Sequence, residues 1–374
     1  MIKQQERKHI LYFSLLWLAV HLFLLGNNGI VTDGESIKYI GQAEKFLQTG
    51  RFSSNNFIFY SLQIFLIAIT LKFKIGFWLI VFIQLIFSWL ASFSFYKLTK
   101  YLFDPLTAFI AIILFLLNIP LQEFNTFLQT ESLFYSISII ISSYVLRLQQ
   151  LKLKQLLLIF LFLLLISFTR PTGLLFFPVV FLFLFYRYFK FISASQKTLL
   201  ITAFSFIFLF ILNAALGTGG EYDFILPFIT ENIICGVPAF SDLRNVQHGA
   251  YDNSLYGLFS YIISHFPQFV KLCWLRSIAF WSLLRSYYSF AHNTYLGIFF
   301  YPIYVFSIYQ LISGYQTIKP VIIYFLSLIV LTWLTVMLTC DDWHNRFFLT
   351  ISPFLILLAS PAITKLTRKY LSVK

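Results

Sequence analysis

The sequence has few charged residues for its length, and acids are especially scarce. Only 14 of its 374 residues are Asp or Glu, charged residues make up 11% of the chain, and 59% of the residues are hydrophobic. Soluble domains contain about 45–50% apolar residues, so this composition excludes an ordinary soluble protein. Only one polar segment is sizeable, which excludes a soluble catalytic domain. We therefore expect an integral membrane protein whose chemistry takes place at the membrane surface.

Cysteine is also scarce, and its spacing excludes two common kinds of site. Cys235, Cys273 and Cys340 are odd in number and far apart, with no C-x-x-C pair. This pattern predicts neither a disulfide framework nor a zinc site, so we interpret the three as packing residues. His344 has no second histidine at ligand spacing, and the adjacent Asp341 and Asp342 are typical of solvated loop charge. The sequence assigns no metal or other cofactor, although a divalent ion is possible.

What the chain does have in excess is basic residues, 27 Lys and Arg for a net charge of +13. They occur in short clusters between apolar runs and not on one continuous face. This pattern is typical of membrane topology, so we expect membrane lipids as partners and no nucleic acid.

The apolar runs predict an all-α polytopic membrane protein that forms one transmembrane domain over residues 1–374. The first run, 10–25, follows the basic stretch "KQQERKH", is longer than a typical signal-peptide core and precedes no A-x-A site, so we expect an uncleaved anchor. Further apolar segments lie at 57–71, 76–96, 106–119, 132–147, 155–169, 172–186, 198–216, 293–312, 320–340 and 347–363.

Segment 57–71 decides the topology, because it is short and ends in "KFK". It either crosses the membrane or lies on its surface as an interfacial helix. A crossing would move most of the basic loops to the outside, against the positive-inside rule. We therefore predict ten transmembrane helices in the inner (plasma) membrane, with both termini cytoplasmic. Most acids then fall on the outer face, where we expect the functional site: its segments are 28–75, 120–131, 217–291 and 340–346.

The first outer segment begins with "GNNGIVTDGESIKYIGQAEKFLQTGRF". Apolar residues recur at helical spacing from 34 to 50, which predicts an amphipathic interfacial helix. Thr32 and Glu35 match a capping box, whereas Asp33 has no such role beyond adding negative charge at a helix start. Carboxylates here could also accept a proton from an attacking hydroxyl, or orient a sugar or a metal. The two interpretations are compatible.

This segment resembles the first outer loop of membrane-embedded glycosyltransferases of the GT-C fold. The likeness rests on an anchor helix, then acids, then Tyr39-x-x-x-Ala43, Gly50 and a second interfacial helix. It is similar to the bacterial branch related to protein O-mannosyltransferases and aminoarabinose transferases. Other stretches that resemble the family are "QTESLFYS" with Glu131, "FTRPTGLLFFP" with Arg170, "WLRSIAFWSLLRSYYSFAHN" with Arg276 and Arg285, and "DDWHNRFFLTISPFLILLAS" with His344 and Arg346.

The resemblance implies transfer of a sugar from a polyprenyl-phosphate donor to a lipid, glycan or protein acceptor on the outer side, in cell-envelope glycan biosynthesis. It implies catalytic roles for Asp33, Glu35 and Glu131, with the choice between the first two left open. The donor's phosphate is the leaving group, and guanidinium groups match its geometry. The candidate phosphate-binding residues are Arg346, His344, Arg170, Arg276 and Arg285. Residues 219–260 are the expected region of acceptor recognition.

Two features weigh against a simple match. The family often has Lys-Pro at the start of the second interfacial helix, where this chain has Asn55-Asn56-Phe57. Another cation must then bind the phosphate, or the chain is an assembly protein that has lost activity. Each cation also has a structural interpretation: Arg276 and Arg285 as interfacial anchors, Arg346 as a flanking charge paired with Asp341 or Asp342, and Arg170 in an ion pair.

Three other classes compete with a glycosyltransferase. A polyprenyl-linked glycan polymerase or ligase also works from the outer face but does not need acids after the first helix. A lipid or solute transporter often has internal repeats and charges near the middle of its spans, and neither is seen here. An inactive assembly protein is the third.

Overall fold

The computed structural model describes residues 2–189, 192–217, 225–235, 251–313, 319–342 and 344–371. In these residues the chain is helical throughout, and its only β structure is two isolated bridges, Val31 with Phe127 and Ile234 with Asp341. The predicted all-α fold class is confirmed.

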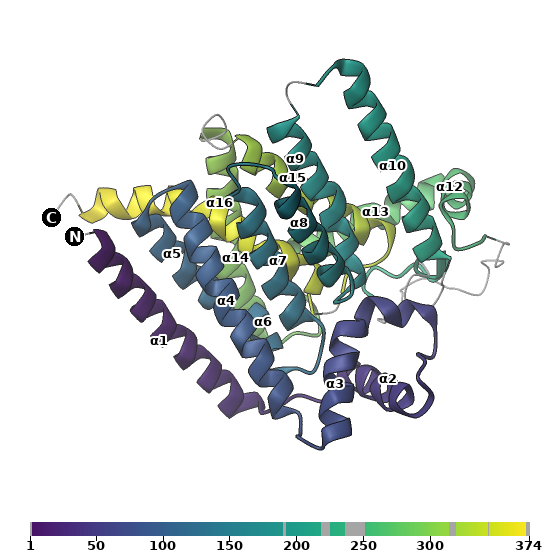
Figure 1. The fold of residues 1–374 in the computed structure, drawn as a ribbon, viewed down its shortest axis with the longest axis horizontal. Helices are drawn as coiled ribbons and strands as arrows, with labels where there is room; N and C mark the ends of the chain where they lie inside the picture. The colour runs from purple at the N-terminus through teal and green to yellow at the C-terminus, as the bar shows by residue number, and fades with distance from the viewer. Residues whose placement is uncertain are drawn as a thin grey trace.

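Every predicted apolar run forms a helix (Figure 1). These helices are α1 (Ile2–Asn28), α3 (Ser61–Phe73), α4 (Trp78–Leu102), α5 (Pro105–Leu116), α7 (Glu131–Leu146), α8 (Leu153–Ser167), α9 (Phe176–Tyr188), α10 (Ala194–Leu216), α14 (Phe290–Ser313), α15 (Lys319–Leu338) and α16 (Arg346–Leu371). The connecting elements are α2 (Glu35–Thr49), α6 (Ile119–Gln122), α11 (Ile225–Ile229), α12 (Leu255–Ser264), α13 (Phe266–Ser282) and the 3₁₀ helices η1 (Asn55–Tyr60), η2 (Glu123–Thr126) and η3 (Pro171–Leu175).

The number of membrane-length helices is lower than predicted. Eight helices in the described residues are long and apolar enough to cross a membrane, or nine if the pair around the 67° bend between α5 and α6 is one span. Helices α7 and α8 fall short of this length. The chain is thus a multi-pass membrane protein by helix length and composition, whereas the count of ten stays a prediction. Residues 55–73 also pass the length criterion, so length alone does not decide whether they cross.

Helix α16 forms the centre of the fold. Of its most apolar stretch, 83% is buried inside the protein, against 6% for α10, which lies at the edge of the molecule in Figure 1. Ser360 and Thr364 lie on this buried helix and donate their hydroxyl hydrogens to the carbonyls one turn earlier, at 2.6 and 2.8 Å. Their polar groups are therefore satisfied within the helix, so they can be buried at little cost.

Helices α1 and α4 are antiparallel neighbours. Near one end Lys100 of α4 pairs with Glu6 of α1 at 2.6 Å, and further along Trp17 Nε1 donates to Ser88 at 3.1 Å. Arg368 of α16 pairs at 2.8 Å with Asp104, which lies in the turn after α4. The two terminal segments therefore lie at the same end of the bundle (Figure 1).

The opposite end, here called the loop end, is formed where segments 29–34, 123–130, 340–342 and 344–346 meet. The backbone N–H of Val31 donates to Thr126 at 3.0 Å, and that of Leu128 donates to Val31 at 3.1 Å. Gln84, near the start of α4, donates to the carbonyl of Phe127 at 3.0 Å. The chain between α1 and α4, with α2 and α3, therefore leaves the bundle and returns to it at the loop end.

Candidate active site at the loop end

Arg346, the first residue of α16, lies at the centre of the loop end and is 4% exposed. Its Nε and Nη2 donate to Asp342 at 2.7 and 2.5 Å, and its Nη1 and Nη2 donate to Glu35 at 2.6 and 2.7 Å. A further bond from Nη1 reaches Glu131 at 2.9 Å. All five N–H donors of this guanidinium are therefore used, and all of them bind carboxylates.

Arg170 supplies the second cation of the site. Its Nη1 donates to the same Glu131 oxygen at 2.6 Å, and its guanidinium carbon lies 5.6 Å from the ring centre of Phe347. Glu131 is completely buried between the two arginines. We call these five residues the charge cluster: Glu35, Glu131, Asp342, Arg170 and Arg346.

Four of the five members lie where a helical element begins. Glu35, Glu131 and Arg346 are the first residues of α2, α7 and α16, and Arg170 directly precedes η3. Helix starts carry partial positive charge and unpaired N–H groups, which favour anions. The helix starts and the two guanidinium groups together explain how three carboxylates can gather at the loop end.

The carboxylates of the cluster differ in their access to solvent. The side chain of Glu35 is 34% exposed, whereas those of Glu131 and Asp342 are 0% and 7% exposed. Burial by itself raises the pKa of Glu35, but the hydrogen bonds and charge of Arg346 outweigh it and hold the pKa well below its usual value. Burial and Arg346 oppose each other in the same way at Asp342, whose pKa is also lowered. Glu35 is therefore the ionised carboxylate through which the cluster meets solvent.

The predicted capping box is wrong. The N-cap of α2 is Gly34, with φ of 59°, and no side chain caps the helix. The carboxylate of Glu35 instead binds Arg346 and accepts a hydrogen bond from Tyr39 at 3.2 Å. Asp33 is exposed, and its side chain makes no hydrogen bond or ion pair with any residue that the structure describes. Of the two candidate acids, only Glu35 belongs to the cluster.

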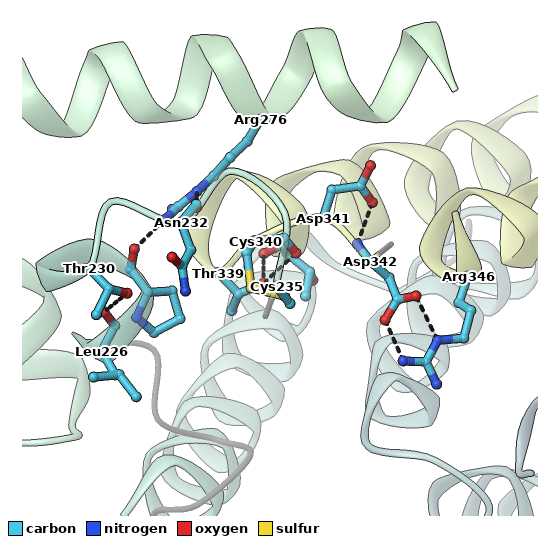
Figure 2. Close-up of a disulfide and its surroundings, with 12 residues drawn as sticks. Leu226, Thr230, Asn232, Cys235, Arg276, Thr339, Cys340, Asp341, Asp342 and Arg346 are labelled. Carbon is cyan, nitrogen blue, oxygen red and sulfur yellow. Dashed lines mark hydrogen bonds and ion pairs between the residues drawn. A yellow bond between two sulfur atoms is a disulfide. The ribbon is translucent and has the colours of Figure 1, made fainter. Parts of the chain in front are cut away.

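The interpretation of the cysteines is also wrong for two of the three. Cys235 and Cys340 form a disulfide that joins positions 105 residues apart, and only Cys273 is free in the described chain (Figure 2). Next to this bond, the N–H of Cys235 donates to Asp341 at 2.8 Å and the N–H of Asp341 donates to Ile233 at 2.9 Å. The disulfide therefore ties the segment after α11 to the residues that lead into the charge cluster.

Asp341 and Asp342 are buried, so their interpretation as solvated loop charge is wrong as well. Figure 2 shows Asp342 against Arg346 and Asp341 beside it. Asp341 pairs with Arg285, whose Nη2 also donates to Asn345 at 2.6 Å. Burial raises the pKa of Asp341 to about 7, even though Arg285 favours its ionised form. The pair of Arg285 and Asp341 thus adjoins the charge cluster through consecutive residues of the chain.

Arg276, predicted as a phosphate ligand or an interfacial anchor, has neither position. It is fully buried, donates to the carbonyls of Pro227, Asn232 and Met337 at 2.8 to 2.9 Å, and lies 4.4 Å from the ring centre of Phe228. Burial lowers its pKa to about 10, so it stays protonated at neutral pH. Figure 2 shows its side chain directed at the segment that leads to Cys235. Arg276 thus supports the loop that carries the disulfide.

His344 is a predicted phosphate-binding residue, and the sequence leaves the binding of a divalent ion open. His344 is exposed, and its backbone N–H donates to Asp342 at 3.0 Å. Within the described ranges no group of three or more His, Cys, Asp or Glu side chains is placed to hold a metal ion.

Of residues 219–260, predicted to recognise the acceptor, 219–224 and 236–250 lie outside the described residues.

Sequence reasoning assigned no functional role to three residues of the site: Asp342, Asn345 and Tyr39. In its structural interpretation from the sequence, Arg346 pairs with Asp341 or Asp342, and the pairing is confirmed for Asp342 at 2.5 Å. Asn345 has a positive φ of 56°, and its side-chain amide donates to Leu283 at 2.9 Å, a role without a sequence signal.

Comparison with known protein families and with curated proteins gives no match to this chain.

Proposed function

We propose that the chain is a glycosyltransferase of GT-C-like architecture that transfers a sugar from a polyprenyl-phosphate donor at the outer face of the membrane. The observation that carries the proposal is the charge cluster. Residues from four segments, up to 311 positions apart, bring three carboxylates to two buried guanidinium groups at one end of a membrane bundle. Buried ion pairs of this kind add little stability, and they are common where charge is bound or moved.

The donor's phosphate suits the cations of the cluster. A phosphate accepts paired N–H bonds from a guanidinium as a carboxylate does. Its negative charge is also stabilised by the free N–H groups and the dipole at the start of a helix. Glu35 is the partner of Arg346 most open to solvent, so it is the one that a phosphate would displace. Displacement would free the Glu35 carboxylate to accept the proton of the acceptor hydroxyl as its oxygen bonds to the sugar, while the bond between the sugar and the phosphate breaks and the phosphate leaves with the electron pair.

Arg170 provides the cation that the missing Lys-Pro would have supplied. The backbone N–H of Leu62, at the start of α3, donates to the carbonyl of Phe168 at 3.0 Å. The beginning of the second predicted interfacial helix therefore lies next to the turn that carries Arg170. In this proposal the lysine absent from 55–57 is replaced by an arginine from another loop.

The arrangement of α1 and α4 supports the predicted topology. These antiparallel helices join through 29–77 at the loop end, which is the arrangement expected if that segment makes no net crossing. Ile37 and Leu47 of α2 are 65% and 41% exposed, although Tyr39 and Ala43 pack inside. An exposed apolar face suits a helix that lies on the bilayer.

The test is the binding of undecaprenyl phosphate, the product that transfer would release, to purified protein in lipid nanodiscs. Arg346→Ala would leave three carboxylates, two of them buried, short of a partner and is expected to unfold the site, so Arg346→Lys is the sharper variant. It keeps the charge but loses the paired donors, and should weaken binding roughly 10- to 100-fold, the equivalent of about 1.5–3 kcal/mol. Arg368→Lys, at the other end of α16, is the matched control and should bind as the parent does.

Equal binding by parent and Arg346→Lys would contradict the proposal. Donor use is measured in the same preparation with tritiated glucosyl-, mannosyl- and galactosyl-phosphoundecaprenol. Transfer that survives replacement of both Asp33 and Glu35 would instead favour a polyprenyl-linked glycan polymerase or ligase, which does not need these acids.

A further inference from the structure

A small pocket opens beside the charge cluster and is not used by the proposed donor site. Its volume is about 50 Å³, room for several water-sized groups at roughly 10–15 Å³ each. It is bounded by η2, the segment before α14, the first turns of α14 and the start of α16. His344 and Asn345, which directly precede Arg346, form one of its walls.

Glu123 is the one acid in the lining of this pocket. It is half-buried, and its carboxylate makes no hydrogen bond or ion pair with any described residue. The contrast with Glu35, Glu131 and Asp342 is complete, since each of those carboxylates binds a guanidinium. A carboxylate with open acceptor sites in a pocket is suited to the hydroxyl groups of a neutral ligand.

The rest of the lining combines imidazole and aromatic side chains. His292, on the first turn of α14, lies with its ring centre 4.3 Å from that of Tyr288. Phe124 and Phe300 are buried and add two further aromatic rings to the lining. A lining that combines aromatic rings with hydrogen-bonding groups matches a sugar, whose C–H faces are apolar and whose edges carry hydroxyls.

We propose that this pocket is the acceptor subsite, that it takes a hydroxyl-bearing edge of a carbohydrate, and that Glu123 orients the acceptor by accepting hydrogen bonds from its hydroxyls. The inference rests on the proposed glycosyl transfer and narrows its acceptor to a glycan. Because His344 and Asn345 belong to the pocket and Arg346 to the phosphate site, a hydroxyl held here lies next to a sugar held by its phosphate there.

The experiment measures sugar binding without any donor. Saturation-transfer NMR is recorded on the full chain in nanodiscs with methyl α-mannoside, methyl β-galactoside and methyl β-N-acetylglucosaminide, and with N-acetyl-threonine amide as a peptide-like probe. At least one glycoside should bind the parent protein, and Glu123→Gln should weaken that binding roughly tenfold or more. Glu123→Asp should retain part of it. The matched control is Glu44→Gln, an exposed acid on α2, which should leave binding unchanged.

The outcomes separate this inference from the proposed function. No glycoside signal with the parent, equal binding by Glu123→Gln, or binding of the threonine probe alone would each overturn the glycan subsite. Glycoside binding that depends on Glu123 supports it, even if the same preparation consumes no polyprenyl-phosphate sugar. Failure to consume any polyprenyl-phosphate sugar would contradict the proposed transfer, whereas the glycoside binding would still support the sugar site.

Discussion

Glu35 is the residue whose predicted role differs most from the role seen in the structure. The sequence makes it part of a capping box, for which glutamine serves equally well. The structure makes it a bidentate partner of Arg346, some 34% exposed and without any capping bond. Asp33, two residues earlier, is exposed and unpaired among the described residues. The two acids can therefore be separated by experiment.

We expect Glu35→Gln to lower the free energy of unfolding by about 1.5–3 kcal/mol at neutral pH, because it removes the charge from two hydrogen bonds to Arg346. Arg346 holds the pKa of Glu35 low, so this stability is present above the ordinary glutamate pKa and is lost as the pH falls through the lowered value. The difference between parent and variant should therefore shrink in acid. Denaturant unfolding in mixed micelles at pH 7 and at pH 3, which lies well below the ordinary glutamate pKa, measures it.

Asp33→Asn should change stability by no more than about 0.5 kcal/mol, as is usual for exposed positions. Loss of sugar transfer by this variant would then report on chemistry and not on folding. Transfer at the parental rate by Asp33→Asn, by Glu35→Gln and by the double variant would show that neither acid takes part in the reaction.

The helical elements themselves were largely predictable. Each apolar run forms a helix because, in a membrane, a segment of this length pairs its own backbone N–H and C=O groups only as a helix. Gly50, noted in the sequence, ends α2 with φ of 70°, and Asp104 caps α5 by accepting from Leu106 and Thr107. These are local signals. The contacts of Arg346 with Glu35 and Glu131 span 311 and 215 residues, and no local pattern encodes which distant acid an arginine meets.

The disulfide is the clearest such long-range contact between elements. Replacing Cys235 and Cys340 together with serine should lower the free energy of unfolding by about 2–5 kcal/mol, since the bond closes a loop of 105 residues. The effect should reach the site, because Cys340 precedes Asp341 and Asp342. Cys273→Ser, at the free and half-buried cysteine, is the control and should cost much less. Gel mobility with and without reductant, together with thermal unfolding, measures both; a double variant as stable as the control would show that the bond contributes nothing.

At the scale of the whole molecule, two features favour the outer side of the membrane for the loop end. Structural disulfides persist in oxidising compartments and are rare in the cytosol, which favours the outer side for Cys235 and Cys340. The basic residues between helices favour the cytoplasm for the end where Glu6 meets Lys100 and Arg368 meets Asp104. With this orientation the charge cluster would face outward, as the proposed polyprenyl-phosphate donor requires.

This orientation can be tested with single cysteines placed in a Cys273→Ser background and a maleimide that does not cross membranes. Glu44→Cys on α2 and Lys74→Cys after α3 should both react in intact cells, because the segment between α1 and α4 leaves and returns at the loop end. Lys152→Cys, exposed before α8, should react only after permeabilisation. Reaction at Glu44 but not at Lys74 would mean that α3 crosses the membrane and that α4 runs in the opposite sense. Reaction at Lys152 in intact cells would place the charge cluster on the cytoplasmic side, where neither the disulfide nor an outward-facing sugar donor is expected.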